Sequence, residues 1–493
     1  MRVSARHEGD LNNQLTPFSS AHRTTVTLIL DQTASLISIQ HTAWMLANLA
    51  VRLDGYVEQL SISCPAGIAT HPNVIPFGEP DSDLSAALVS AAKSLGIVPV
   101  TTGTAGGIEL HLGPGQAPAA GWRVYGDGWC GGITKAAIHE ESKSGLPFGP
   151  YIAACFAAAE VFKQMRVRRE HYSPSEGFYD AWNLQPSGAF VANGPAALCD
   201  RLLECTLAGV GAVGNAFLHT MLACPSLQLT ATLADNDKKG LDATNLNRYV
   251  LFGKNELGKL KPDATSALLN SSRMRLTPWN DAAENLPTLS SRVLSAVDKN
   301  TSREGIQFRY PARIFSASTS DLRAEVLRCG PPAKGACLRC YNPPEALPPD
   351  TELIARLQKA SPEELARFCA TAGVSVADCQ TWLKTRKCGE AGERLISVLR
   401  EEDGADGAFA VGFTSVLAGT LLAVEFIKDC FGLSRVLADD LNRCTFQFFE
   451  VLSPANRSSF LPIDPKCPIC DSKRRSSLRV WQKRFADLGP QRG

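Results

Sequence analysis

Four cysteines stand in two Cys-x-x-Cys pairs, Cys337 with Cys340 and Cys467 with Cys470. Two thiolates at this spacing can bind one metal ion, and two such pairs complete a closed tetrahedral zinc site with no position left for a catalytic water. A disulfide within each pair and a redox-active pair are the alternatives. Because both pairs occur in a chain that shows no sign of an oxidising compartment, we predict bound Zn²⁺. Residues 341–466 must then bring the chain back to its starting point.

A glycine-rich stretch offers a second kind of chemistry. Gly209, Gly211 and Gly214 follow an apolar run and open a predicted helix, so that backbone N–H groups and the helix N-terminus can receive a phosphate or a ribose. Asp235 follows Gly214 by 21 residues, at the end of the next predicted strand, where a carboxylate accepts hydrogen bonds from ribose hydroxyls. These features alone leave open a nicotinamide dehydrogenase or a Rossmann-like lobe without a ligand.

The residues that come next favour ATP over a dinucleotide. Asp237 adds a second acid, and an amide and two cations follow it, namely Asn245, Arg248 and Lys261. A triphosphate needs fixed cations and usually a metal, whereas a dinucleotide carries only a diester pyrophosphate. Each side chain also has a purely structural alternative: Asp235 can cap a turn, and Arg248 and Lys261 can be solvated surface charges.

Taken in order, the glycine loop, the Asp-x-Asp pair, TNLNR and GKLK resemble the superfamily of MoeB, ThiF and the ubiquitin-activating E1 enzymes. The resemblance covers residues 200–345 and recurs at 408–470. It implies an adenylation domain whose ribose is held by Asp235 and whose ATP phosphates are held by Asn245, Arg248 and Lys261. The two cysteine pairs resemble the zinc site of the MoeB type.

The resemblance also implies a magnesium ligand. Its best match is Asp298, which follows the apolar strand predicted at 293–297. This acid could instead cap the helix that comes after it. ATP, Mg²⁺ and Zn²⁺ are therefore the expected cofactors.

The candidate nucleophile is Cys388. Arg386 and Lys387 precede it, and Gly389 follows it at the predicted start of a helix. Two cations and a helix N-terminus favour thiolate over thiol, and the glycine leaves room for a bulky acyl group. Cys379 is the second candidate, although it is predicted to lie inside a helix, as is Cys369. Other cysteines lie in apolar contexts that predict buried side chains: Cys155, Cys205, Cys224 and Cys430.

The elements that position these residues form two similar lobes. Buried helices are predicted at 149–163 and 412–428, each with a small, apolar body and a Glu-x-x-Lys tail. A strand, helix, strand order precedes the first helix at 24–63 and the second at 196–237, and only the second contains the glycine loop. We therefore predict an α/β fold with two Rossmann-like lobes of the adenylation type, the first degenerate and the second active.

The predicted domains follow from this layout. Residues 1–175 form the degenerate lobe and 176–345 the first part of the active one. Residues 346–406 form a helical insertion with the candidate nucleophile, in which Ser361 with Glu364 and Ser375 with Asp378 have capping-box spacing. Residues 407–493 return to the active lobe with the second cysteine pair and a basic tail. The uncharged run at 407–424 contains several Gly, Ser and Thr residues, so a helix buried in protein is predicted.

Composition excludes several classes of protein. The 493 residues hold 50 Lys and Arg against 49 Asp and Glu, and 44% are hydrophobic, which fits neither a disordered acidic chain nor a strongly basic nucleic-acid binder. No charged stretch followed by an apolar one opens the sequence, and cysteine is about 3% of it, which favours a cytoplasmic protein. We expect no nucleic-acid or membrane partner.

The layout most resembles a fused E1 of the type found in the bacterial Bil conjugation operons. This resemblance implies adenylation of the C-terminus of a ubiquitin-like protein with MgATP, then a thioester on Cys388 for transfer to an E2-like protein. The two lobes would form a pseudo-dimer within one chain, monomeric or bound to its partners. A MoeB- or ThiF-type sulfur-carrier adenylyltransferase, a nicotinamide dehydrogenase and a non-catalytic scaffold are the alternatives.

Overall fold

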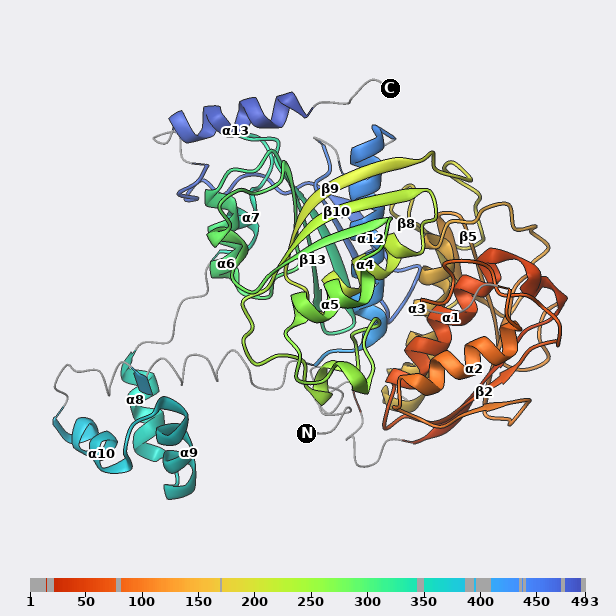
Figure 1. Ribbon diagram of the computed structural model, residues 1–493, viewed down its shortest axis with the longest axis horizontal. Coiled ribbons are helices and arrows are strands. Elements are labelled where there is room, and N and C mark those ends of the chain that lie inside the picture. The colour runs from red at the N-terminus through yellow and green to blue at the C-terminus, as the bar shows by residue number, and fades with distance from the viewer. Residues whose placement is uncertain are drawn as a thin grey trace. The chain divides into compact units, whose positions relative to one another are not determined.

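The computed structural model describes residues 15, 22–76, 81–168, 171–343, 350–385, 394–395, 409–433, 437, 440–470 and 475–488. The chain divides into two compact units. One contains residues 1–343 and 409–493, and the other contains residues 344–408. The larger unit holds two sheets with their helices, and the smaller one is helical (Figure 1).

The first sheet has eight strands in the order β3-β2-β1-β4-β5-β6-β7-β8. Strands β3 to β5 pair in parallel and β5 to β8 pair antiparallel. The bounds are β1 (Thr24–Ile29), β2 (Val57–Ser63), β3 (Val100–Thr102), β4 (Ile108–Leu112), β5 (Trp122–Asp127), β6 (Cys130–Thr134), β7 (Gly177–Asp180) and β8 (Gln185–Ser187). Because β7 and β8 complete this sheet, the domain boundary predicted at 175/176 falls inside the first lobe: the aromatic segment after residue 175 pairs with β6.

The second sheet repeats the same order, β11-β10-β9-β12-β13-β14-β15-β16, with the same change from parallel to antiparallel pairing. Its bounds are β9 (Arg201–Ala208), β10 (Leu227–Ala234), β11 (Met274–Trp279), β12 (Arg292–Ser295), β13 (Arg313–Ser320), β14 (Arg323–Cys329), β15 (Arg443–Gln447) and β16 (Arg457–Ser459). The repeated topology confirms the prediction of two Rossmann-like lobes in one α/β chain.

The helices of the larger unit follow the same repeat. The first lobe has α1 (Ile37–Arg52), α2 (Leu84–Ser94) and α3 (Phe148–Arg166). The second has α4 (Ala212–Leu222), α5 (Lys261–Leu269), α6 (Asn300–Phe308), α7 (Leu338–Tyr341), α12 (Gly412–Phe431) and α13 (Arg475–Asp487). Helix α3 stands between β6 and β7, as α12 stands between β14 and β15. Within the described ranges, no helix is long and apolar enough to cross a membrane.

The two lobes share a core built from helices that are buried on every side. Helix α3 contacts both α1 and α12, and α12 also contacts α4 (Figure 1). Gly419 of α12 allows the closest approach, since a Cβ there would lie 2.6 Å from Ala216 Cβ and 2.7 Å from Phe217 N in α4. This contact requires a small residue at Gly419, and the part of the run from Gly412 onward is a helix in the protein interior, as predicted.

The Glu-x-x-Lys tails of α3 and α12 join the lobes reciprocally. Lys163 and Glu160 lie 2.8 Å apart, as do Lys428 and Glu425, and all four side chains are buried. Lys428 also donates to the carbonyls of residues 181 and 182 in the first lobe, and Lys163 donates to that of residue 449 in the second. Each buried cation is therefore paired within its own helix and bonded to the opposite lobe.

The smaller unit lies between β14 and α12 in the chain and contains α8 (Asp350–Lys359), α9 (Pro362–Ala372) and α10 (Val376–Thr385). The predicted cap at Ser361 is present, because its hydroxyl accepts from Glu364 N while the Glu364 carboxylate accepts from Ser361 N. Ser375 caps α10 with Asp378 in a similar way. Both helix starts predicted in the insertion are thus confirmed.

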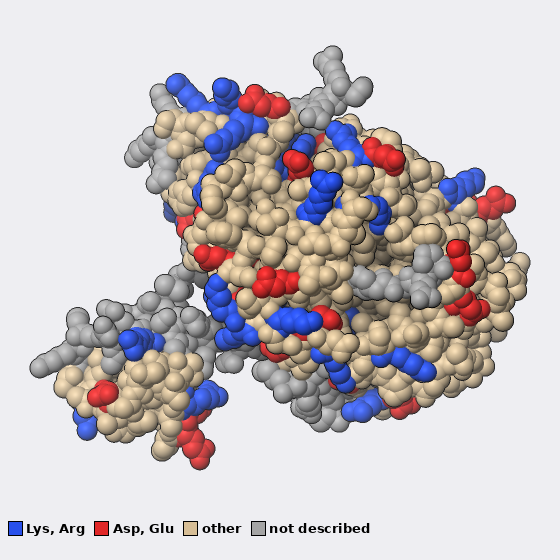
Figure 2. Space-filling view, viewed as in Figure 1, with Lys and Arg blue, Asp and Glu red and all other residues tan. Residues whose placement is uncertain are grey.

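On the face in Figure 2, Lys and Arg side chains are interspersed with Asp and Glu over the two-sheet unit. This mixture agrees with the near balance of charges in the sequence. Binding selectivity on this face must therefore arise from local groups rather than from one large field.

Candidate functional site

The glycine loop joins β9 to α4 at the carboxyl end of the second sheet. Gly209 has a φ of +90°, and a Cβ there would lie 2.6 Å from the carbonyl oxygen of Ala296. A Cβ on Gly214 would lie 2.2 Å from the carbonyl oxygen of Gly209, so this residue lets the helix pack onto its own loop. Gly211 is the N-cap of α4. The loop therefore leads directly into the first turn of α4, as predicted from the sequence. The N–H groups of a first helical turn favour an anion.

Asp235, Asp237 and Lys261 form an ionic cluster beside this loop. Lys261 Nζ lies 2.7 Å from Asp237 Oδ2 and 3.9 Å from Asp235 Oδ1. The Asp235 carboxylate also accepts from the backbone N–H groups of Val210 and Asp237, at 2.9 and 3.0 Å. The Asp235 carboxylate therefore links the glycine loop to the turn that follows β10.

The charges of this cluster stabilise one another. Burial alone would lower the pKa of Lys261, but Tyr249, Asp235 and Asp237 outweigh it and raise that pKa well above its ordinary value. Burial would raise the pKa of Asp237, but its bonds to Lys261 and to the backbone N–H of Lys239 lower it overall. The cluster therefore presents a fixed ammonium and a carboxylate at neutral pH.

The TNLNR segment lies next to the cluster and is held largely by its own backbone. Asn245 accepts from Asp242 N at 3.0 Å in a capping box and is buried. Arg248 donates to Thr244 O and to Asn247 Oδ1, both at 2.9 Å. These contacts fix both predicted phosphate ligands to one short stretch of chain.

Side chains of α1 in the first lobe donate hydrogen bonds to the backbone in and after that stretch. Arg52 of α1 donates to the carbonyls of Leu246 and Phe252 at 2.6 and 2.9 Å, and Asn48 donates to that of Val250 at 2.9 Å. Burial lowers the pKa of Arg52 to about 9. This guanidinium therefore holds backbone of the second lobe.

Tyr249 is a residue of the site that the sequence analysis missed. Its side chain is buried, and its hydroxyl lies 3.5 Å from the position of a Cβ on Gly211. Its ring lies 5.4 Å from Arg248 Cζ and 6.0 Å from Lys261 Nζ. The signal available in the sequence was its place directly after Arg248, inside the segment already singled out.

Asp298 lies in the loop after β12, and its side chain is exposed. This loop touches the glycine loop, since Ala296 N donates to Ala208 O at 2.7 Å and a Cβ on Gly209 would meet Ala296. The N-cap of the following helix, α6, is Lys299. Asp298 therefore does not cap that helix and lies near the site that the other predicted residues form.

In the first lobe, the equivalent loop is closed by its own side chains. Asp31 follows β1 by two residues and accepts from both the backbone N–H and the hydroxyl of Thr33, at 2.8 and 2.6 Å. A Cβ on Gly113 would lie 2.6 Å from that hydroxyl, so the neighbouring loop fills the space. This loop thus differs from the glycine loop of the second lobe, because an Asp side chain caps its first turn.

The four zinc-type cysteines converge although residues 341–466 separate the pairs. Their sulfur atoms all lie within 4.8 Å of one another. Cys337 Sγ is 3.5 Å from Cys340 Sγ and 3.7 Å from Cys467 Sγ, and Cys340 Sγ is 3.7 Å from Cys470 Sγ. Four sulfurs each about 2.3 Å from a tetrahedral zinc ion would lie about 3.8 Å apart. The cluster thus fits a metal ion, and Trp481 of α13 packs against it.

The candidate nucleophiles lie in the smaller unit. Cys388 and its neighbours at 386–390 fall outside the described residues. Cys379 is buried in α10, and burial together with its hydrogen bond to Cys369 raises its pKa to about 12. Such a thiol is a poor nucleophile at neutral pH, which weakens the second candidate.

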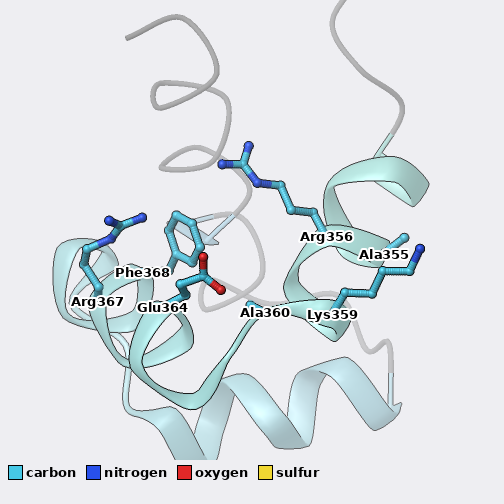
Figure 3. Close-up of a pocket in the computed structure, with 7 residues that line it drawn as sticks. All are labelled: Ala355, Arg356, Lys359, Ala360, Glu364, Arg367 and Phe368. Carbon is cyan, nitrogen blue, oxygen red and sulfur yellow. The ribbon is translucent and has the colours of Figure 1, made fainter. Parts of the chain in front are cut away.

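A hollow in the smaller unit is lined by residues of α8 and α9 and by Ala360 between them. Figure 3 shows Phe368 between the guanidinium groups of Arg356 and Arg367. The two Cζ atoms lie 5.7 and 5.1 Å from the ring centre. Glu364 and Lys359 also line the hollow.

Two family models match parts of this chain. Residues 195–468 match the ThiF family model, and residues 81–173 match the BilD N-terminal domain model. A curated relative, the uncharacterized protein y4jF of Sinorhizobium fredii, is 26% identical over 247 residues, 49% of this chain. The chain spans about half (47%) of the length of that relative.

Among solved structures, the chain is similar to E. coli MccB with succinimide and to the same protein with MccA-N7isoASN. Identity is 16% in both comparisons, with TM-scores of 0.34 and 0.35. The aligned parts cover 54% and 55% of this chain and 66% and 67% of those chains.

Proposed function

Because the chain belongs to the ThiF family, we propose that it is an ATP-dependent adenylating enzyme that activates the C-terminal carboxylate of a ubiquitin-like protein. One observation carries the proposal. Asp235, Asp237 and Lys261 meet beside the glycine loop at the N-terminus of α4, within the matched residues. Family membership also argues against the nicotinamide dehydrogenase.

In the proposed reaction, an oxygen of the substrate carboxylate attacks the α-phosphorus of ATP. The bond from that phosphorus to the pyrophosphate oxygen breaks, and an acyl adenylate and pyrophosphate result. Asp235 would accept from the ribose, the Gly209–Gly214 loop would bind phosphate, and Arg248 and Lys261 would neutralise the charge that builds on the phosphate oxygens. Asn245 would bind the phosphates with these cations, and Asp237 would orient Lys261.

Mg²⁺ would neutralise further phosphate charge, and Asp298 is the residue proposed to hold it. Asp298 fits this ion because it is an exposed carboxylate in the loop that touches the glycine loop, and Mg²⁺ prefers oxygen ligands. Zn²⁺ is proposed for the four cysteines as a structural ion, because they leave no open position. Metal analysis of the purified protein should find about one zinc per chain, and its absence would refute that assignment.

A second step is proposed for the helical insertion. The thiolate of Cys388 would attack the acyl carbon, release AMP and form a thioester for transfer to an E2-like protein. The match of residues 81–173 to the BilD N-terminal domain favours thioester formation for conjugation over sulfur-carrier activation. Both functions would use the same adenylation site. The location of the insertion between β14 and α12 supports it as well.

Two measurements test the two steps separately. Exchange of radiolabelled pyrophosphate into ATP, with candidate ubiquitin-like proteins supplied, should occur with the parent protein and with Cys388→Ala. A non-reducing gel should then show an adduct, removed by dithiothreitol, with the parent and with Cys379→Ala but not with Cys388→Ala. Exchange without any adduct, together with a thiocarboxylate product, would favour the sulfur-carrier function instead.

A further inference from the structure

Tyr249 brings a hydroxyl group to the start of α4. This hydroxyl lies 3.5 Å from the position that a Cβ on Gly211 would occupy, and Gly211 is the residue that caps the helix. The side chain is only 3% exposed. A buried phenol is costly unless its oxygen has polar neighbours, so the surroundings of this oxygen decide what it does.

Two cationic side chains lie close to the ring of this tyrosine. Arg248 Cζ and Lys261 Nζ lie over its ring, at 5.4 and 6.0 Å from the centre. Guanidinium and ammonium groups only donate hydrogen bonds, and so do the first N–H groups of a helix. Lone pairs of the phenol oxygen can therefore face these donors, but its O–H needs an acceptor that these groups do not provide.

The acceptor that this O–H requires indicates the ligand chemistry. A helix N-terminus beside two cations attracts an anion, and an anionic oxygen is the acceptor that a hydroxyl at this point would bind. Packing alone would not require the hydroxyl, because the ring already packs near Phe252, with 6.1 Å between ring centres. A phenylalanine would fill the same space.

We infer that Tyr249 is a nucleotide-binding residue, whose hydroxyl donates a hydrogen bond to a phosphate oxygen of ATP at the start of α4. The inference rests on the proposed function and adds a neutral donor to the two cations. The ring holds Arg248 and Lys261 by its face, while the hydroxyl contacts the phosphate directly.

Calorimetry with the Mg²⁺ complex of α,β-methylene-ATP tests this inference in the full chain, and adenosine serves as a ligand without phosphates. Tyr249→Phe should weaken binding of the analogue about tenfold to a hundredfold, because a hydrogen bond to a charged group is lost. Adenosine binding and the melting temperature should stay unchanged. Tyr125→Phe is the matched control, since it removes another buried phenol oxygen, in the first lobe, and should change neither ligand's affinity.

The outcomes separate the inference from the proposed function. If the parent binds the analogue and Tyr249→Phe binds it equally well, the assignment of Tyr249 fails and the proposed function stands. Equal weakening of the analogue and adenosine would point to a structural role and would also overturn the assignment. If the parent itself does not bind the analogue, both the inference and the adenylation function are overturned.

Discussion

At the scale of single residues, Lys261 pairs with two carboxylates and is also proposed to bind a phosphate of the nucleotide. Without a ligand its ammonium neutralises Asp237 at 2.7 Å and approaches Asp235 at 3.9 Å. A phosphate at the start of α4 would compete for the same cation, since it carries more charge than either carboxylate. In the proposed function, the charges of this cluster would already be in place before a substrate binds.

Replacing Lys261 by Met tests this interpretation. The change removes the cation while it keeps an unbranched side chain of similar length, so charge on the phosphates would no longer be offset. Pyrophosphate exchange should fall by roughly a hundredfold to a thousandfold, the usual effect of losing one transition-state contact.

Lys259 offers a control two residues away. Its side chain is about half exposed and lies 3.9 Å from Glu256, so Lys259→Met should leave exchange within about twofold. Lys261→Arg should retain part of the activity because it keeps the charge. Full exchange activity in Lys261→Met would contradict the assigned role.

At the scale of elements, α12 is the helix that joins the two lobes, and Gly419 sets how closely it packs on α4. An added Cβ would lie 2.6 Å from Ala216 Cβ and 2.7 Å from Phe217 N, closer than atoms in a packed core can approach. The helix or its neighbour must then move. Small residues along α12 thus follow from close helix contact and not from a membrane environment.

Gly419→Ala should destabilise the protein, although alanine is the better helix former. Intrinsic propensity would favour alanine by about 1 kcal/mol, whereas the overpacked contact should cost about 1–3 kcal/mol, so the expected net loss is up to about 2 kcal/mol. Chemical denaturation would give the change in the free energy of unfolding. Gly188→Ala is the control, because a Cβ there has open space. A stabilised Gly419→Ala protein would show that the helices are not in close contact.

At the scale of the whole molecule, a buried polar network crosses the interface between the lobes. His219 of α4 accepts from Trp44 Nε1 of α1 at 3.2 Å and lies 2.9 Å from the hydroxyl of Tyr151 of α3. Burial, with His41 and Arg52 nearby, lowers the pKa of His219 to about 3. Burial and His71 lower the pKa of His41 to about 3 as well. Both imidazoles are therefore neutral in the folded protein.

The two neutral histidines make the free energy of unfolding depend on pH in one direction. Between pH 6.5 and about 3 the unfolded chain binds protons that the folded protein does not, so the free energy of unfolding should fall as the pH falls through this range. The stability is fully present above pH 6.5. At pH 5 each buried histidine should cost about 2 kcal/mol.

Urea denaturation between pH 7 and pH 5 measures the effect. His41→Leu removes one of these two imidazoles. The number of protons taken up on unfolding, which sets the slope of unfolding free energy against pH, should therefore decrease by close to one. An unchanged slope in this variant would show that His41 is not held neutral by burial.

Periodicity and spacing in the sequence determined the elements. Apolar strands, the two buried helices and the caps at Ser361 and Ser375 depend on neighbours within a few residues, and their predictions are confirmed. The cysteine spacing likewise predicted a four-sulfur cluster that the sheet order brings together. Local chemistry is enough for such features, since each one follows from short-range hydrogen bonding or ligand geometry.

Only the tertiary structure decided which residues far apart in the chain contact one another. That β7 and β8 belong to the first sheet, that Asp235 is bonded to the glycine loop, and that Arg52 holds the carbonyls of the second lobe all depend on contacts between segments far apart in the chain. Tyr249 became part of the site for the same reason, because its position next to Gly211 results from folding around α4. Residue types specify which bonds a side chain can make, but packing decides which partner it meets.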